Sequence, residues 1–342
     1  MWQRFVIFLL LALLSRALVA PQAPVELSNE ELLSHVDAGD LQALSAVLDA
    51  SPSLVNYQNE GGHTLLHRAA SLGHLEVVQY LITNLGADLV LPNMVINGFH
   101  ALHWSCSNGH EQVVKLLLDS GAPIEARDFN GRTPLMIACE RGHRAIALLL
   151  IENGASIEAE SDDLKAPLHY AAFSGLLPVV QLLVNRGLDV NARTKWKDTP
   201  LHYACSGTSM GHVKIIHLLL ERGAEVDALG MQGDTPFHWA CWKGLGAIAE
   251  LLVRHGADML WAGYGHLEQH DATPFSLGAC EVEPLRSKLA AAYDKAAELR
   301  QGLRALAQEG EKSCAAGSGK CRSADGEEAH QGDDAGTSRD EL

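Results

Sequence analysis

The sequence is 342 residues long, with 47% apolar residues, 6% aromatic residues and a formal net charge of -16. The apolar fraction is large enough to bury a sizeable core, which excludes a mainly disordered chain. The strong negative charge, with no run of basic residues among aromatic ones, excludes a nucleic-acid-binding surface.

Residues 1–20 have the features of a secretory signal peptide. Arg4 precedes an apolar run over residues 5–14, and the small residues Ala17 and Ala20 follow it. The run is too short for a transmembrane helix, which needs roughly 20 apolar residues. We therefore predict a leader that is cleaved after either Ala17 or Ala20, and no membrane span after cleavage.

Residues 28–57 are predicted to form a pair of helices. This segment lacks the motif that recurs after it, and it carries acidic and polar side chains. Because a stacked array of repeats needs a polar end, the pair is interpreted as an N-terminal cap.

A four-residue motif recurs over residues 58–283. It is represented by Thr199-Pro200-Leu201-His202, and its copies start at residues 64, 100, 133, 166, 199, 235 and 273. Proline fits the first turn of a helix, and the threonine before it is a good capping residue, so each motif predicts the start of an inner helix. The end of each outer helix is predicted at a glycine, namely Gly86, Gly121, Gly154, Gly187, Gly223 and Gly256.

These phased motifs resemble ankyrin repeats, whose period is about 33 residues. The resemblance covers about residues 28–300. It implies an all-α repeat solenoid, in which helix-turn-helix units are joined by β-turn fingers and stack into one continuous core.

Residues 284–309 are predicted to form a C-terminal helix. Apolar residues recur along it in steps of four and three, at Leu285, Leu289, Ala292, Ala296, Leu299, Leu303 and Leu306. Two interpretations stay open, a helix that caps the solenoid and a coiled-coil seam that joins two copies into a homodimer.

Residues 310–342 are predicted to be a disordered acidic tail, because Gly, Ser, Asp and Glu dominate and no apolar period is present. The last four residues, Arg339, Asp340, Glu341 and Leu342, resemble the Lys-Asp-Glu-Leu family of endoplasmic-reticulum retrieval signals. A leader and a retrieval signal together predict the lumen of the endoplasmic reticulum and a retrieval receptor as one partner. Cys314 and Cys321 lie close enough in this tail to form a loop disulfide.

Most histidines and cysteines occupy repeated positions. His67, His103, His169, His202 and His238 stand in the motif, and His74, His110, His143 and His212 lie between the two helices. In ankyrin repeats such histidines hydrogen-bond turns and neighbouring repeats, so no metal or other cofactor is predicted. Five cysteines share one small buried slot and are expected to be free thiols, namely Cys106, Cys139, Cys205, Cys241 and Cys280.

No catalytic motif is found. The sequence lacks a nucleophile elbow, a phosphate-binding glycine loop, a His-Glu-x-x-His motif and a dinucleotide fingerprint. We therefore do not expect an enzyme.

The resemblance places partner contacts on the finger tips and along the inner helices. The candidate residues there are aromatic or basic: Trp104, Phe129, Arg132, Arg141, Tyr170, Phe173, Lys195, Trp196, Lys197, Tyr203, Trp239, Trp242 and Lys243. Packing between inner helices is the alternative role for the residues that follow the motif histidine. Repeats four to six are favoured, because two lysines flank Trp196 in an otherwise acidic chain.

The resulting hypothesis is a protein-binding scaffold or adaptor of the endoplasmic reticulum lumen, with a protein partner. One alternative is a subunit that regulates or positions a lumenal redox or glycan-processing enzyme. Another is a cytosolic ankyrin adaptor, if both end signals are accidental.

Overall fold

The computed structural model describes residues 29–259 and residue 295. Within these residues the chain forms fourteen α-helices, one short 3-10 helix and no β-strand. The fold class is therefore confirmed as an all-helical repeat solenoid. The predicted leader, the seventh motif, the acidic tail and all of the C-terminal helix except Lys295 lie outside the described residues.

The first helices, α2 (Asn29–Ala38) and α3 (Leu41–Ala50), precede the repeats and are followed by a 3-10 turn, η1 (Pro52–Leu54). The Asp40 side chain begins α3 by accepting a 2.9 Å hydrogen bond from the amide of Ala43. Helix α2 packs against both α3 and the first inner helix. Its buried residues Leu32 and Val36 join it to the core of the stack.

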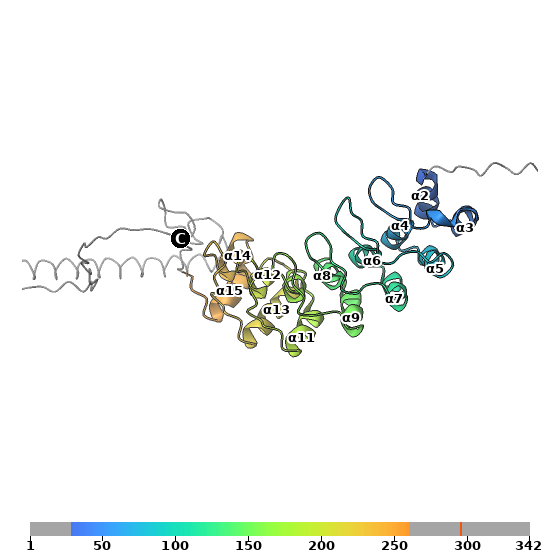
Figure 1. The fold of residues 1–342 in the computed structure, drawn as a ribbon. Helices are drawn as coiled ribbons and strands as arrows, with labels where there is room; N and C mark the ends of the chain where they lie inside the picture. Colours follow the sequence, from blue (N-terminus) through green and yellow to red (C-terminus); the bar gives the residue numbers. More distant parts are fainter. Residues whose placement is uncertain (1–28, 260–294, 296–342) are drawn as a thin grey trace, which may run out of the picture. The chain divides into compact units, whose positions relative to one another are not determined.

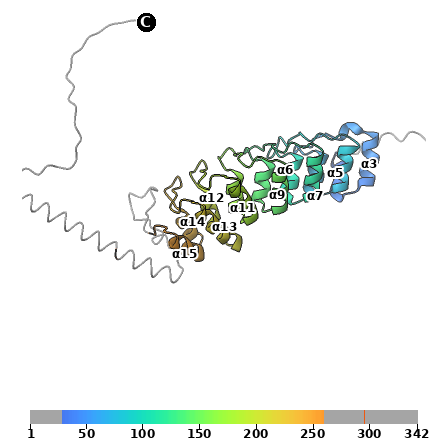
Figure 2. The ribbon, with the colours of Figure 1, turned by 90° about the horizontal axis from the view of Figure 1, so that it is seen from below.

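Each of the six repeats that follow contains an inner and an outer helix, and Figure 1 shows the two rows that they form. The inner helices are α4 (Leu65–Leu72), α6 (Ala101–Asn108), α8 (Pro134–Glu140), α10 (Pro167–Phe173), α12 (Pro200–Ala204) and α14 (Pro236–Trp242). The outer helices are α5 (Leu75–Thr83), α7 (Glu111–Asp119), α9 (Arg144–Glu152), α11 (Leu177–Asn185), α13 (Met210–Glu221) and α15 (Gly246–Arg254). In Figure 2 the outer row faces the viewer.

The motif begins the inner helices as predicted. The Thr64 hydroxyl accepts a hydrogen bond from the amide of His67 (3.2 Å), and Nδ1 of His67 accepts one from the amide of Thr64 (3.1 Å). The other ring nitrogen, Nε2, donates to the carbonyl of Leu91 in the loop before the next repeat (2.9 Å). One histidine therefore closes its own helix and joins two repeats.

The two hydrogen bonds of the ring, from the capping residue's amide to Nδ1 and from Nε2 to a carbonyl further along the chain, recur at three further motif histidines, and all four rings are neutral. Burial, which outweighs the hydrogen bonds to backbone carbonyls, lowers the pKa to about 4 at His67, His103, His169 and His202. The histidines between the helices bond backward instead, as Nε2 of His110 does to the carbonyl of Ser71 (2.9 Å) and Nε2 of His212 does to that of Phe173 (2.8 Å). The predicted structural role of the histidines is confirmed at these positions.

The small slot near the end of the inner helix is filled as predicted in three repeats. Cys106, Cys139 and Cys205 are free and fully buried. Burial raises the pKa of the Cys139 thiol to about 12, which makes it unreactive.

Cys241 differs, because it is disulfide-bonded. The expectation of a free thiol was therefore wrong at this position, and Cys280 lies outside the described residues. The expectation rested on the distance between equivalent slots in stacked repeats. Because the other three described cysteines are free, the cysteine bonded to Cys241 lies outside the described residues.

The segment before each inner helix forms a finger, numbered by the repeat that it precedes. Figure 1 shows the fingers projecting on the side of the inner helices. Single backbone hydrogen bonds join the tips of successive fingers, as from the amide of Lys195 to the carbonyl of Asp163 (2.9 Å) and from that of Phe129 to Asn97 (3.0 Å). The fingers therefore form a continuous edge with defined neighbours.

Candidate protein-binding surface

Aromatic residues line the inner helices of repeats four to six. The ring of Tyr203 lies 6.5 Å from that of Phe173 and 5.7 Å from that of Trp239, in edge-to-face orientations. Tyr203 also packs on the ring of His169 (5.7 Å), and Trp239 packs on that of His202 (5.6 Å). These contacts favour the packing role for Tyr203 and Trp239, although both stay half-exposed.

Tyr170 lies deeper than its neighbours in the row. Only 8% of the residue is exposed, and its hydroxyl lies 3.5 Å from that of Ser161. Burial is also the main cause of its raised pKa. At this position the structure favours packing over contact with a partner.

Lys165, which the sequence analysis missed, lies among three aromatic rings at the base of the fourth finger. Its ammonium is 4.9 Å from the ring centroid of Trp196, 5.4 Å from that of Tyr203 and 6.0 Å from that of Tyr170. These are cation–π distances. Lys165 therefore joins the tip of the fifth finger to the inner helices.

A pocket of about 130 Å³ opens beside Lys165. It is lined by Glu140, Lys165, His169, Tyr170, Phe173 and Tyr203. The pocket thus combines aromatic walls with one cation and one carboxylate, and it is large enough for part of a side chain.

Three large aromatic residues of this region are exposed. Phe173 is 49% exposed, Trp196 39% and Trp242 72%. The ammonium of Lys243 lies 5.0 Å from the ring of Trp242. Exposed aromatic residues beside cations are typical of the energetically dominant parts of protein interfaces.

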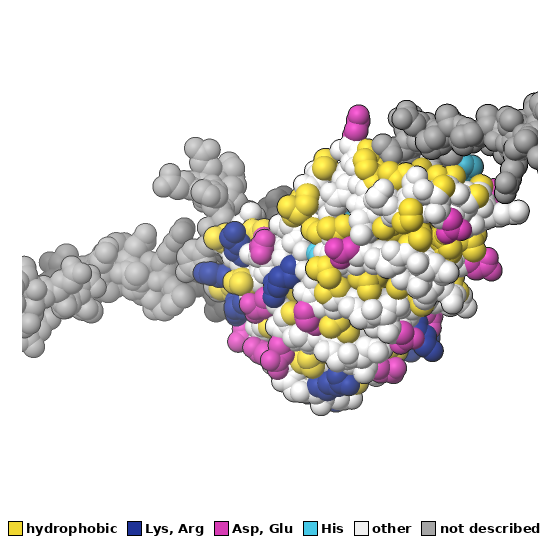
Figure 3. All heavy atoms as spheres, turned by 45° about the vertical axis from the view of Figure 1, so that its right-hand side comes forward, with side chains coloured by type: hydrophobic (Ala, Val, Ile, Leu, Met, Phe, Trp, Pro, Cys, Tyr) yellow, Lys and Arg dark blue, Asp and Glu magenta, His cyan; other side chains and the backbone are white. Residues whose placement is uncertain are grey.

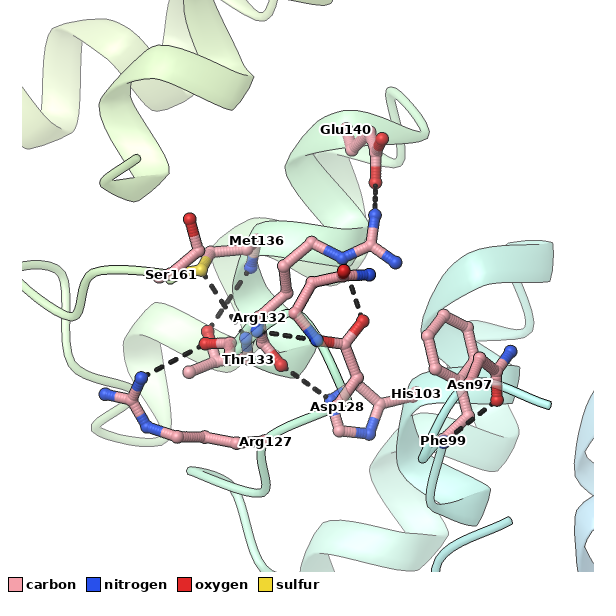
Figure 4. A network of polar contacts seen from close by, with 12 residues as sticks. Asn97, Phe99, His103, Arg127, Asp128, Arg132, Thr133, Met136, Glu140 and Ser161 are labelled. Atoms are coloured by element: carbon pink, nitrogen blue, oxygen red, sulfur yellow. Dashed lines mark hydrogen bonds and ion pairs between the residues drawn. The ribbon is translucent and has the colours of Figure 1, made fainter. Parts of the chain in front are cut away.

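Arg132 is used within the chain, as Figure 4 shows. Its Nε lies 2.8 Å from Oδ2 of Asp128, and its Nη1 lies 2.7 Å from Oε2 of Glu140. The Asp128 side chain is fully buried, and it also accepts the amide hydrogens of Asn130 and Arg132. Arg132 therefore holds the third finger against α8, a role that its sequence position did not reveal.

The remaining candidates lie in the second and third repeats or on the fifth finger. Trp104 is half-buried against Phe99 (5.1 Å between centroids), and its indole nitrogen has no hydrogen-bond partner among the described residues. Phe129 is 49% exposed. Arg141, Lys195 and Lys197 are also exposed.

The fingers also expose apolar side chains outside this set of candidates. The second finger exposes Val90, Met94, Val95 and Ile96, the fourth exposes Leu164 and the sixth exposes Met231. On the face shown in Figure 3, hydrophobic side chains are concentrated in the upper part, which is the finger side. In the sequence, the longer segment between Gly86 and Gly98 could have indicated that the second finger is enlarged.

Two finger tips have strained backbones. Leu164 and Lys197 have φ angles of 58° and 63°, at the position where Gly131 and Gly233 stand in neighbouring fingers. A residue with a β-carbon in this left-handed region costs roughly 1–2 kcal/mol. Aligning the finger sequences would have identified both positions.

Two carboxylates approach each other beneath the sixth finger. Burial, together with the negative charge of Asp234, raises the pKa of Asp198 to about 6, while Lys165 acts in the opposite direction. Asp234 accepts a hydrogen bond from the indole of Trp239. The described residues contain no group of three or more potential metal ligands, and none of their helices is long and apolar enough to span a membrane.

Comparisons with known proteins agree with this architecture. The family described as ankyrin repeats (3 copies) matches residues 90–161 and 168–260, and the single ankyrin repeat matches residues 61–94. A probable E3 ubiquitin-protein ligase of Oryza sativa subsp. japonica is 37% identical over 110 residues, which are 32% of this chain and 22% of the ligase.

Two animal proteins show a similar likeness. The ankyrin repeat and SAM domain-containing protein 6 of Mus musculus is 33% identical over 115 residues, which are 34% of this chain and 13% of that protein. Diacylglycerol kinase iota of Rattus norvegicus is 34% identical over 113 residues, which are 33% of this chain and 11% of the kinase.

The chain thus spans about a fifth or less of the length of these relatives, and the matches cover only the repeat region. The ligase and kinase names therefore carry no activity over to it. The phased capping motifs, the two rows of helices and the family match show that this chain belongs to the ankyrin-repeat family.

Proposed function

We propose that this chain is a protein-binding scaffold of the endoplasmic reticulum lumen, which holds its partner on the fingers and inner helices of repeats four to six. The observation that carries the proposal is the group of exposed aromatic rings on three successive repeats, Phe173, Trp196 and Trp242. Because neighbouring aromatic residues such as Tyr170 and Tyr203 pack internally, these three rings are the aromatic side chains of repeats four to six that remain exposed to a partner.

The proposed location is supported by three features. Residues 1–20 resemble a leader, and residues 339–342 resemble a retrieval signal. Cys241 is disulfide-bonded, and structural disulfides are typical of oxidising compartments such as this lumen.

Recovery of partners from the lumen tests the binding surface. We expect Trp196→Ala and Trp242→Ala to reduce the recovery of cross-linked partners with the full chain. Tyr57→Ala is the matched control, because Tyr57 is 36% exposed and precedes the first repeat. Equal recovery with all three variants would contradict the proposed surface.

The location is tested in cells and in microsomes. We expect the full chain to resist protease in intact microsomes and to be digested after detergent is added. Deleting residues 339–342 should cause secretion into the medium, because the retrieval receptor can no longer bind the chain. Digestion without detergent would favour a cytosolic adaptor instead.

A further inference from the structure

The fourth and fifth fingers depart from a rule that the other fingers follow. At the tip position with positive φ, the remaining fingers have Gly62, Gly98, Gly131 and Gly233. The fourth and fifth have Leu164 and Lys197 instead, in the same left-handed conformation. Their β-carbons make this conformation unfavourable, whereas glycine adopts it without steric cost.

In two of the other fingers, the next finger enforces the glycine. A β-carbon at Gly98 would lie 2.5 Å from Cδ1 of Phe129, and one at Gly131 would lie 2.4 Å from Oδ1 of Asp162. No such exclusion acts at the fourth and fifth tips, where Leu164 is 45% exposed and Lys197 is also exposed. Both side chains therefore extend from the edge into solvent.

Neither side chain has a polar role within the described part of the chain. The ammonium of Lys197 makes no hydrogen bond or ion pair there, and the same is true of Lys165 and Lys195. Arg193 on the fifth finger, in contrast, is paired with Glu225 at 2.7 Å. The strain at Leu164 and Lys197 is thus not offset by a polar contact inside the described chain.

The charge around these tips differs from that of the chain as a whole. Three unpaired lysines, Lys165, Lys195 and Lys197, surround Trp196, whereas the whole chain has a formal charge of -16. The fourth tip contributes two accessible carboxylates, Asp162 and Asp163, whereas Asp198, next to Lys197, is buried. Among the accessible side chains of the two tips that form no ion pair, three lysines therefore exceed two carboxylates by one charge, which favours an anionic partner segment.

We infer that Leu164 and Lys197 are contact residues for an acidic segment of the partner protein, which lies extended across the fourth and fifth fingers. A carboxylate of this segment pairs with Lys197, and an adjacent apolar side chain packs on Leu164 and Trp196. The inference rests on the proposed function for the class of partner, and it adds the chemistry of the segment, a new contact residue, Leu164, and a specific role for Lys197.

Labelled synthetic peptides test the chemistry of the segment with the full chain. The probes are a peptide of alternating Glu and Leu, one of alternating Lys and Leu, and one of alternating Glu and Ser. We expect the Glu/Leu peptide to bind most tightly, with an affinity that falls as salt is added. Tighter binding of the Lys/Leu peptide, or no binding of the Glu/Leu peptide, would overturn the inference.

Substitution by glycine separates contact from fold, because glycine fits the tip conformation. Leu164→Gly and Lys197→Gly should each raise Tm by about 2–4 °C and weaken binding of the Glu/Leu peptide about tenfold. Leu164→Ala should weaken binding equally without the rise in Tm, since it keeps the β-carbon. Lys115→Ala on outer helix α7 is the control for charge and should leave binding unchanged.

The outcomes also distinguish this inference from the proposed function. If the glycine variants raise Tm and bind the Glu/Leu peptide as the original chain does, Leu164 and Lys197 are not contacts. If they also recover lumenal partners normally while Trp242→Ala does not, the proposed function stands and the inference fails. If Trp196→Ala and Trp242→Ala recover partners normally as well, the proposed function fails.

Discussion

His169→Met should make the protein less stable at neutral pH and less sensitive to acid. The variant copies a residue that the chain already uses, because Met136 occupies the motif position of the third repeat. His169 accepts from the amide of Ala166 through Nδ1 (3.1 Å) and bonds the carbonyl of Ala192 through Nε2 (3.0 Å). Losing both of these hydrogen bonds in a buried site should lower the free energy of unfolding by about 2 kcal/mol at pH 7.

The pH dependence follows from the pKa of His169, which burial lowers from 6.5 to about 4. Because the folded-state pKa lies below the unfolded one, the contribution to stability is complete above pH 6.5 and is lost as the pH falls toward 4. The loss is about 1.4 kcal/mol for each pH unit, or about 2 kcal/mol at pH 5. The original chain and the variant should therefore become nearly equal in stability at pH 5.

Urea unfolding at pH 7 and pH 5, followed by circular dichroism, measures this convergence. The reverse variant Met136→His should behave in the opposite way: its free energy of unfolding should be higher than that of the original chain at pH 7 and should fall more steeply as the pH is lowered. A gap between the original chain and His169→Met that is the same at both pH values would refute the reasoning, because it would mean that His169 is not held neutral by the fold.

Two further predictions concern buried groups. Arg132→Ala should lower the free energy of unfolding by about 2–3 kcal/mol, because the buried carboxylate of Asp128 loses its cation and keeps only two amide donors. Urea unfolding measures this change, and a decrease below about 0.5 kcal/mol would show that the ion pair does not stabilise the fold. Thiol alkylation of the native protein, read by mass spectrometry, should leave all four described cysteines unlabelled, and reduction should convert Cys241 and the cysteine bonded to it into thiols. The three that stay protected are Cys106, Cys139 and Cys205; labelling of any of them in the native state would contradict their burial.

The repeats could be predicted from the sequence because their determinants are local. Thr64 caps the first inner helix through reciprocal hydrogen bonds with His67, only three residues further on. Short-range spacing is therefore sufficient to predict where such a helix begins. The glycines at helix ends act in the same way, and Gly121 and Gly154 have the expected positive φ angles of 88° and 89°.

The determinants of the surface were less accessible because they depend on side-chain contacts that the spacing of residues in the sequence does not reveal. Arg132 looked like a free contact residue, yet the structure pairs it with Asp128 and with Glu140 eight positions away. Lys165 was overlooked because its neighbours Trp196 and Tyr203 lie more than thirty positions along the chain. The bond at Cys241 was missed because equivalent slots in stacked repeats were expected to be too far apart to bridge.

Binding residues in a repeat protein are best sought where the framework leaves a side chain unused. Arg132 forms two ion pairs within the chain and Tyr170 is buried, so altering either should change stability before it changes binding. Trp242 and Lys197, in contrast, are exposed. Because every repeat must meet the same requirements for capping and packing, an exposed side chain that departs from them at a cost for folding, as Lys197 does at a glycine position, is the place to test for a contact outside the fold.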